Sequence, residues 1–159
     1  MQELQGSPRA AGYRFAIVVS RFNSEITDGL LAGARDVLAQ AGVRDDDVTL
    51  VRVPGAFELP VAAQRLAESG RVDAVICLGC LIKGDTMHFE YIADAATRGI
   101  SEVGLATGVP VAFGVLTTLT DEQAEVRARP GDGNKGREAA LAAVEMATLL
   151  RTIDGGPAR

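Results

Sequence analysis

The chain has 159 residues, of which 47% are hydrophobic, and it carries a net charge of −5. This composition predicts one folded domain, and the negative charge argues against a nucleic-acid partner, which requires a basic face. The apolar stretches are shorter than the ~18 residues of a membrane span, and polar residues 1–12 lack a signal-peptide core, so we expect a cytoplasmic protein without membrane contacts.

Apolar runs alternate with segments of helical periodicity along the chain. Residues 1–12 are predicted to form an N-terminal arm outside the core, and residues 154–159 a C-terminal tail. A single domain is expected over residues 13–153. Within it, strands are expected at 14–20, 48–53, 74–81 and 111–116, and helices at 25–41, 58–69, 86–98, 120–128 and 134–152.

Several residues mark predicted helix ends. Asn23 or Ser24 is expected to cap the first helix. Thr120 and Gln123 match a capping box, in which each side chain bonds backbone N–H groups of the first turn. Gly99 is expected to interrupt the third helix.

Alternating strands and helices predict an α/β fold with a parallel sheet of four strands and helices on both faces. In such sheets, ligands bind outside the carboxyl ends of the strands. The first three predicted strands are followed by Phe22–Asn23, Gly55–Glu58 and Leu81–His88. We therefore expect these three segments to converge on one site.

The stretch from Cys77 to Tyr91 carries the strongest chemical signal. A short loop joins its buried strand to a helix, and the N–H groups and dipole at a helix start favour an anion. His88, the only histidine, lies in the first turn of that helix. An imidazole there can accept and donate protons near neutral pH, although an ordinary surface or capping role stays open.

Other candidates also allow two interpretations. Phe22 is either a stacking platform or a hydrophobic staple at the helix start. Glu58 is either a carboxylate favoured by the helix dipole or an acceptor for substrate hydroxyls. Arg127 and Lys135 flank a glycine-containing loop and are either solvated charges or a phosphate clamp.

The two cysteines, Cys77 and Cys80, form a C-x-x-C that could be a redox pair or half a metal site. We favour a structural role, because residues three apart in a strand point to opposite faces. We therefore expect no metal. The sequence also lacks a G-x-G-x-x-G after a strand and a Walker sequence, which argues against nucleotide binding.

The chain resembles the lumazine synthase family over about residues 14–153. The resemblance rests on five motifs in the family's order, which are specific in combination: R-F-N at 21–23, V-P-G-A-F-E-L-P at 53–60, L-I-K-G-D-T-M-H-F-E-Y at 81–91, F-G-V-L-T at 113–117 and G-N-K-G at 133–136. It implies a flavodoxin-like three-layer sandwich that assembles into pentamers, with active sites between neighbouring subunits.

The resemblance also implies the penultimate step of riboflavin biosynthesis. In that step 5-amino-6-(D-ribitylamino)uracil condenses with 3,4-dihydroxy-2-butanone 4-phosphate to give 6,7-dimethyl-8-ribityllumazine, without a metal or organic cofactor. The uninterrupted motif spacing favours an icosahedral shell of sixty subunits, although Pro130 is a departure in a loop that bears on assembly. A riboflavin synthase is a candidate partner inside such a shell.

Carried over by position, the resemblance implies roles around the uracil ring. Phe22 would stack on the ring, and Asn23 would line that side of the site. Backbone groups of Leu81 and Ile82 would bind the ring. His88 would move protons.

The resemblance implies two further groups of contacts within the same subunit. Ala56, Phe57 and Glu58 would meet the ribityl chain. Asp85 and Thr86 would bind phosphate through the N–H groups at the helix start.

A neighbouring subunit would complete the site. Phe113 would cover it, Arg127 would grip phosphate, and Lys135 would reach the ligand. Asp85 is a departure, because the family often has a small neutral residue there. We expect its carboxylate to point to solvent or to pair with a base such as Lys83.

Three rival interpretations remain open on the sequence. One is a binding module for a flavin or another phosphorylated ligand. Another is a shell protein that has lost catalysis, and the third is a family member that binds a flavin at the same site. An activity assay and a search for a bound yellow chromophore separate them.

Overall fold

The computed structural model describes residues 1–155, so most of the expected tail at 154–159 lies outside the described residues. Four parallel strands form one sheet in the order β2-β1-β3-β4. Their bounds are β1 Phe15–Ser20, β2 Val48–Val53, β3 Ala74–Ile82 and β4 Val111–Thr118. The helices are α1 Ser24–Gln40, α2 Leu59–Glu68, α3 His88–Thr107, α4 Asp121–Ala128 and α5 Lys135–Ile153, with short 3-10 turns η1 Asp45–Asp47 and η2 Ala56–Glu58.

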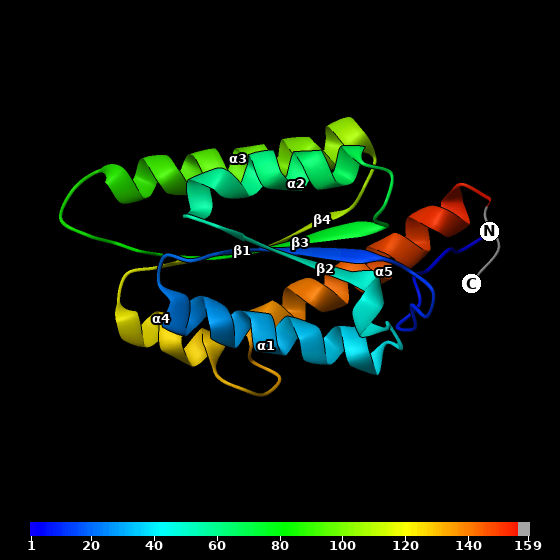
Figure 1. Cartoon of the computed structure of the whole chain (residues 1–159), viewed down its shortest axis with the longest axis horizontal. Coiled ribbons are helices and arrows are strands. Elements are labelled where there is room, and N and C mark those ends of the chain that lie inside the picture. Colours follow the sequence, from blue (N-terminus) through cyan, green and yellow to red (C-terminus); the bar gives the residue numbers. More distant parts are fainter. Residues whose placement is uncertain (156–159) are drawn as a thin grey trace.

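Helices cover both faces of the sheet: α2 and α3 lie on one side, and α1, α4 and α5 on the other (Figure 1). Alternation along β1 explains both cores. Phe15, Ile17 and Val19 face α1 and α5, whereas Ala16 and Val18 face α2 and α3. Because both faces are buried, the strand is a continuous apolar run, and the predicted three-layer α/β fold is confirmed.

The two cysteines behave as structural residues. Cys77 belongs to the core beneath α2 and α3, and Cys80 to the core beneath α1 and α5. Both are buried and free. The expectation that they point to opposite faces of the sheet is therefore confirmed.

The predicted capping box at the start of α4 is formed only in part. The backbone N–H of Gln123 donates to Thr120 Oγ1 at 3.2 Å, so Thr120 caps the helix as expected. Gln123 Oε1 accepts from the N–H of Leu119 at 2.9 Å, one residue before the N-cap residue that a capping box requires.

The predicted interruption at Gly99 is wrong, because α3 runs without a break from His88 to Thr107. A Cβ on Gly99 would lie 2.7 Å from the Cβ and Cγ of Pro60 in α2. The glycine thus permits close packing of α2 against α3, and that packing outweighs the ~1 kcal/mol helix penalty of glycine. The helix also begins two residues later than predicted, at His88.

The N-terminal arm packs on its own chain instead of lying outside the core. Ala10 is fully buried, and its N–H donates to the carbonyl of Ala41 at 2.8 Å. The N–H of Ser7 donates to Thr148 Oγ1 in α5, also at 2.8 Å. The arm therefore links the end of α1 to α5. Among the described residues, no helix is long and apolar enough to cross a membrane.

Candidate active site

A cavity of ≈ 520 Å³, here the strand-end cavity, lies at the carboxyl ends of β1, β2 and β3. Parallel strands end at one edge of the sheet, so segments distant in sequence meet there. The structure thereby brings the first three strand ends together, as expected. The lining residues are Phe22, Pro54, Gly55, Ala56, Phe57, Glu58, Cys80, Leu81, Ile82, Gly84, Thr86, His88, Phe89 and Ile92.

Two aromatic side chains stand at the mouth of this cavity with large exposed surfaces. Phe22 is 67% exposed and Phe57 is 57% exposed. This exposure argues against Phe22 as a hydrophobic staple, because a staple residue packs against its helix. Backbone bonds from Arg21 to Val53 (2.8 Å) and from Phe22 to Pro54 (3.2 Å) join the loops after β1 and β2. Phe22 thus lies on a loop that is held by backbone hydrogen bonds, and its exposed ring is available for stacking.

Asn23, the residue after Phe22, does not line the strand-end cavity. Its backbone is left-handed, with φ of 57°, a conformation that asparagine tolerates better than most residues. The side-chain amide does not cap α1. Its Nδ2 donates to the carbonyl of Cys80 at 3.0 Å, so Asn23 ties the loop after β1 to the end of β3.

Glu58 closes the turn that precedes α2. Its Oε2 accepts the N–H of Gly55 at 3.0 Å, and Ala56 between them is buried. An ionised carboxylate has about four acceptor positions, so one backbone bond leaves capacity for hydroxyl groups in the cavity. Glu58 can therefore serve both the turn and a ligand.

The loop after β3 places Thr86 and His88 on the cavity, whereas exposed Asp85 does not line it. Of the two expectations for Asp85, exposure to solvent agrees with the structure, whereas pairing with Lys83 does not. Lys83 Nζ instead lies 3.1 Å from Glu90 Oε1. The reason is geometric, because the first turn of α3 carries Glu90 back toward the end of β3.

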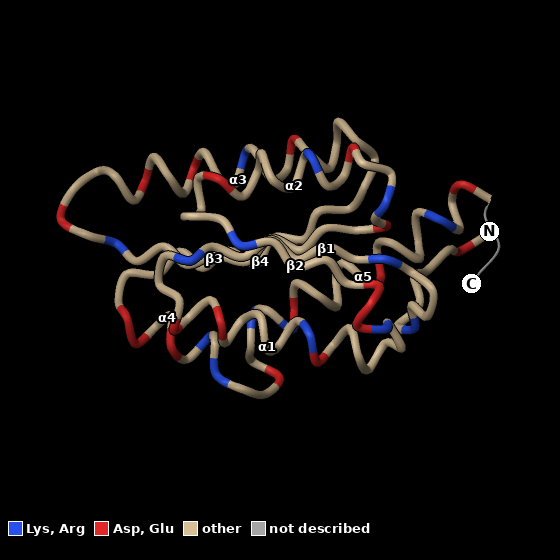
Figure 2. Tube along the Cα trace, viewed as in Figure 1, with Lys and Arg blue, Asp and Glu red and all other residues tan. Residues whose placement is uncertain are grey.

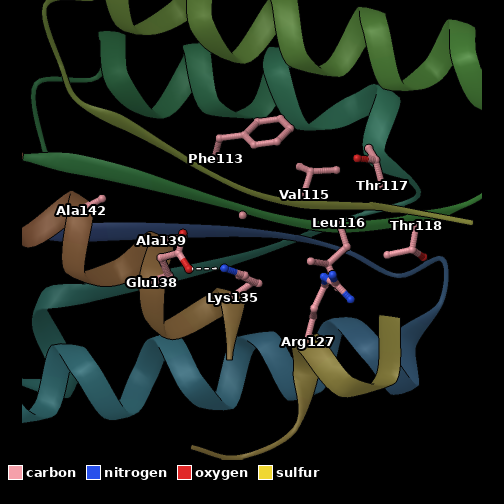
Figure 3. Close-up of a pocket in the computed structure, with 11 residues that line it drawn as sticks. Phe113, Val115, Leu116, Thr117, Thr118, Arg127, Lys135, Glu138, Ala139 and Ala142 are labelled. Carbon is pink, nitrogen blue, oxygen red and sulfur yellow. Dashed lines mark hydrogen bonds and ion pairs between the residues drawn. The ribbon is translucent and has the colours of Figure 1, made fainter. Parts of the chain in front are cut away.

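A second cavity of ≈ 340 Å³, here the β4-edge cavity, lies between edge strand β4 and helices α4 and α5 (Figure 3). Arg127 extends from α4 toward β4, and its Nη1 also donates to the carbonyl of Gln123 at 2.9 Å. Lys135 is ion-paired with Glu138 on α5. The lining residues are Phe113, Gly114, Val115, Leu116, Thr117, Thr118, Arg127, Lys135, Glu138, Ala139 and Ala142.

The two cavities share no lining residue in the described chain. Of the predicted site residues, Phe22, Ala56, Phe57, Glu58, Leu81, Ile82, Thr86 and His88 meet in the strand-end cavity. Phe113, Arg127 and Lys135 meet in the β4-edge cavity. One chain therefore presents two separate groups of predicted residues.

Helical spacing would have predicted several lining residues that the motifs did not mark. Ile92 follows His88 by four residues and lies on the same face of α3. On α5, Glu138, Ala139 and Ala142 follow Lys135 at spacings of three, four and seven. Residues at such spacings share one face of a helix, so the predicted positions of His88 and Lys135 could have identified these further lining residues.

The strand-end cavity is poor in charge. Glu58 and His88 are its ionisable side chains in the described part of the chain, where no lysine or arginine lines it, and Cys80 points into the core beneath α1 and α5. Burial and the nearby charge of Asp121 raise the pKa of Cys80 to about 11, and burial raises that of Cys77 to about 12. These thiols are therefore poor nucleophiles at neutral pH. Residues 1–155 contain no group of three His, Cys, Asp or Glu placed to hold a metal ion.

Comparison with known proteins gives a consistent result. The family model for 6,7-dimethyl-8-ribityllumazine synthase matches residues 12–151. A 6,7-dimethyl-8-ribityllumazine synthase of Salinibacter ruber is 53% identical over 152 residues, which cover 96% of this chain and 97% of that protein. The motifs, the three-layer fold and these matches agree, and the chain belongs to the 6,7-dimethyl-8-ribityllumazine synthase family, whose enzymes act in riboflavin biosynthesis.

Proposed function

We propose that the chain carries out its family's condensation at a composite site. The strand-end cavity of one copy would be completed by the β4-edge cavity of a second copy. The substrates are 5-amino-6-(D-ribitylamino)uracil and 3,4-dihydroxy-2-butanone 4-phosphate, and the products are 6,7-dimethyl-8-ribityllumazine, phosphate and water.

One observation carries the composite arrangement. Within residues 1–155, no lysine or arginine lines the cavity that holds His88, yet one substrate carries a phosphate. Arg127 and Lys135 lie in the other cavity, at the free edge strand of the sheet. Arginine matches phosphate with two parallel hydrogen bonds, so a second copy that docks its β4 edge here supplies the missing cation.

This docking joins two different surfaces of the chain and is therefore head-to-tail. Head-to-tail contacts close into rings when the rotation between copies allows it. Exposed apolar side chains, including Leu105 at 86% and Leu119 at 63%, are available for such contacts. We expect the pentamer of the family resemblance and, from the motif spacing, a shell of sixty subunits in the cytoplasm, with a riboflavin synthase as its candidate partner.

Within the strand-end cavity, Phe22 would stack on the uracil ring, and backbone groups of Leu81 and Ile82 would bind the ring edge. The exposure of Phe22 supports this role. Glu58 would accept hydroxyls of the ribityl chain beside Ala56. Phe57 would lie along the same chain, and Asn23 would support this side of the site through its bond to Cys80.

Around the phosphate, the N–H groups of Asp85 and Thr86 would act together with Arg127. The loop between β3 and α3 supports this role, because its exposed backbone lies directly before the start of α3, whose dipole favours anions. Lys135 would exchange Glu138 for the ligand, and Phe113, which is 44% exposed, would cover the site from the second copy.

The chemistry requires several proton transfers. The uracil's amine attacks the ketone and loses water to form a Schiff base. Phosphate is then eliminated, the enol tautomerises, and the ring closes with loss of a second water. His88 would carry protons between these steps, which is typically worth ~10²–10⁴-fold. Holding both reactants face to face can reach effective molarities of ~10⁵ M, so positioning should contribute more than His88 does.

The first test follows fluorescent lumazine from the two substrates against a protein-free blank, since the condensation proceeds slowly unaided. We expect enzyme-dependent product that falls strongly in Arg127→Ala. A rate equal to the blank, from folded and assembled protein, would overturn the proposed activity. A bound yellow chromophore in that protein would favour the flavin-binding alternative.

A second test examines whether two copies share one site. Phe22→Asp damages the strand-end cavity and Arg127→Ala damages the β4-edge cavity, and both side chains are exposed enough to replace. Equal amounts of the two variants, unfolded and refolded together, should recover about a quarter of wild-type activity, the statistical share of sites with two intact halves. Activity no greater than the sum of the separate variants would contradict a shared site.

A further inference from the structure

The loop between β3 and α3 is bracketed by two charged residues to which the proposed function gives no role. Lys83 is the first residue after β3, and Glu90 lies in the first turn of α3. Their ion pair, 3.1 Å between Lys83 Nζ and Glu90 Oε1, spans residues 84–87. Figure 2 shows both signs of charge on this loop and on the start of α3, at the left of the view.

The two ends of this segment are held more firmly than its middle. The N–H of Lys83 donates to the carbonyl of Thr118 at the end of β4, at 2.9 Å. Residues 84–87 are exposed, and a Cβ placed on Gly84 would meet no atom within 4 Å. Thr86 Oγ1 accepts only a long bond, 3.5 Å, from the N–H of His88. Among the described residues, the ion pair is thus a direct side-chain link between the end of β3 and the first turn of α3.

We infer that Lys83 and Glu90 are positioning residues for the condensation. Their pair holds the start of α3, with His88 and the phosphate-binding N–H groups, at a set distance from the end of β3. This inference rests on the proposed function, which places proton transfer and phosphate binding on this loop. Neither side chain lines the strand-end cavity, so both act through the loop they join.

Because the ion pair is partly exposed, its effect on the reaction rate can be distinguished from its effect on the stability of the fold. The side chains of Lys83 and Glu90 are 48% and 36% exposed. Pairs at such positions contribute little to the stability of a fold. Displacement of a catalytic group by ~1 Å can nevertheless cost ~10²-fold in rate. The variants should therefore lose activity while unfolding at nearly the wild-type temperature.

Replacing Lys83 and replacing Glu90 should have different effects, because the two changes leave opposite charges beside the loop between β3 and α3. Hydrogen bonding to Lys83 lowers the pKa of Glu90, so the carboxylate is ionised at neutral pH, and its Oε2 is buried without a partner among the described residues. Lys83→Met leaves that negative charge uncompensated near the phosphate. Glu90→Gln leaves a free cation there instead. The first variant should weaken phosphate-substrate binding, whereas the second should spare it.

The experiment measures kcat and both KM values for wild type, Lys83→Met, Glu90→Gln and Lys83→Arg. Lys83→Met should raise the KM of the butanone phosphate about 10-fold and lower kcat, because both repulsion and displacement act. Glu90→Gln should lower kcat about 10-fold with that KM nearly unchanged. Lys83→Arg keeps the ion pair and should stay within about 2-fold of wild type.

Arg98→Met is the matched control, because Arg98 forms an exposed ion pair with Asp94 at 2.8 Å on the same helix without spanning the loop. It should leave all three kinetic constants unchanged. All these variants should lose no more than about 2–4 °C in thermal unfolding, as expected for surface pairs.

Wild-type kinetic constants in Lys83→Met and Glu90→Gln would overturn the inference and leave the proposed function intact. Equal losses in both variants and in Arg98→Met would also overturn it, as a general effect of helix charge. If Lys83→Met fails to assemble, the double variant Lys83→Glu with Glu90→Lys tests the inference instead. It re-forms the ion pair with the charges exchanged, so its kcat should be higher than that of Glu90→Gln. Wild-type protein without activity would instead overturn the proposed function.

Discussion

The two cavities differ in how the fold builds them. The strand-end cavity is assembled from loops that follow three parallel strands, and its walls are largely apolar apart from the side chains of Glu58, Thr86 and His88. The β4-edge cavity is assembled mainly from an edge strand and one face of α5, and it holds Arg127 and Lys135. Under the proposed function, stacking of the uracil ring and the cations for the phosphate are thus divided between two regions of one chain.

This division indicates why assembly and catalysis are expected to depend on each other. A cavity at a strand edge is open on one side, and a cavity without a cation holds a phosphate poorly. Each region provides what the other lacks. The predictions below test this comparison, from the largest expected effect to the smallest.

Arg127→Ala should have the largest effect on activity. Loss of a charged hydrogen-bonding partner costs ~1.5–3 kcal/mol, so kcat/KM for the butanone phosphate should fall on the order of 10²-fold. Steady-state kinetics measure this. Arg129→Ala is the control, because Arg129 ends the same helix, is exposed and does not line the cavity. Equal losses in the two variants would remove the special role of Arg127.

Alanine substitutions at Gly136 in α5 and at Gly99 in α3 should reduce the stability of the fold by different amounts. A Cβ on Gly136, beside Lys135, would clash with the backbone carbonyl of Leu30 in α1, whereas a Cβ on Gly99 meets only the ring of Pro60. Gly136→Ala should cost about 3 kcal/mol or more, and Gly99→Ala less, because the overlap with the Leu30 carbonyl is deeper than that with the Pro60 ring. Thermal unfolding at one protein concentration compares them. The reverse order would show that α1 and α5 adjust freely.

His88→Ala should slow turnover but leave clear activity. Acid–base help at its lower range is on the order of 10²-fold, and water can replace part of it, whereas positioning survives in this variant. Its loss in kcat/KM should therefore be smaller than that of Arg127→Ala. Product at the level of the protein-free blank, from assembled His88→Ala, would reverse this ranking.

The cysteines should show the smallest response. Burial raises the pKa of Cys80 to about 11 and that of Cys77 to about 12, and only the thiolate reacts with alkylating reagents. Incubation of native protein with iodoacetamide at pH 8 should therefore label neither residue and leave activity unchanged. Denatured protein, with ordinary thiol pKa values, is the positive control. Rapid labelling of Cys80 in native protein would show that the core beneath α1 and α5 opens more readily than the structure indicates.

Much of the architecture could be predicted from local pattern. Buried parallel strands are continuous apolar runs, and the helix cap at Thr120 needs only residues within one turn. The convergence of Phe22, Glu58 and His88 followed from a general property of parallel sheets. The family motifs indicated the reaction and many, though not all, of the residues that line the two cavities.

Contacts between distant segments could not be predicted in this way. Gly99 was expected to break α3, yet Pro60 from another helix makes a glycine suitable there. Ala10 was assigned to an arm outside the core, but α1 and α5 bury it. Lys83 was named as a pairing partner for Asp85, but it pairs with Glu90, because the first turn of α3 brings that carboxylate close to it.

The sequence by itself therefore determined the order of strands and helices, the burial of the sheet and the chemical types of the site residues. The family resemblance implied that Arg127 reaches the site from a neighbouring subunit, and the tertiary structure showed which residues surround His88 and Arg127 in two separate cavities of one chain. The physical reason is that periodicity and capping depend on neighbours within a few residues. The position of one cavity relative to another depends on how all three layers pack.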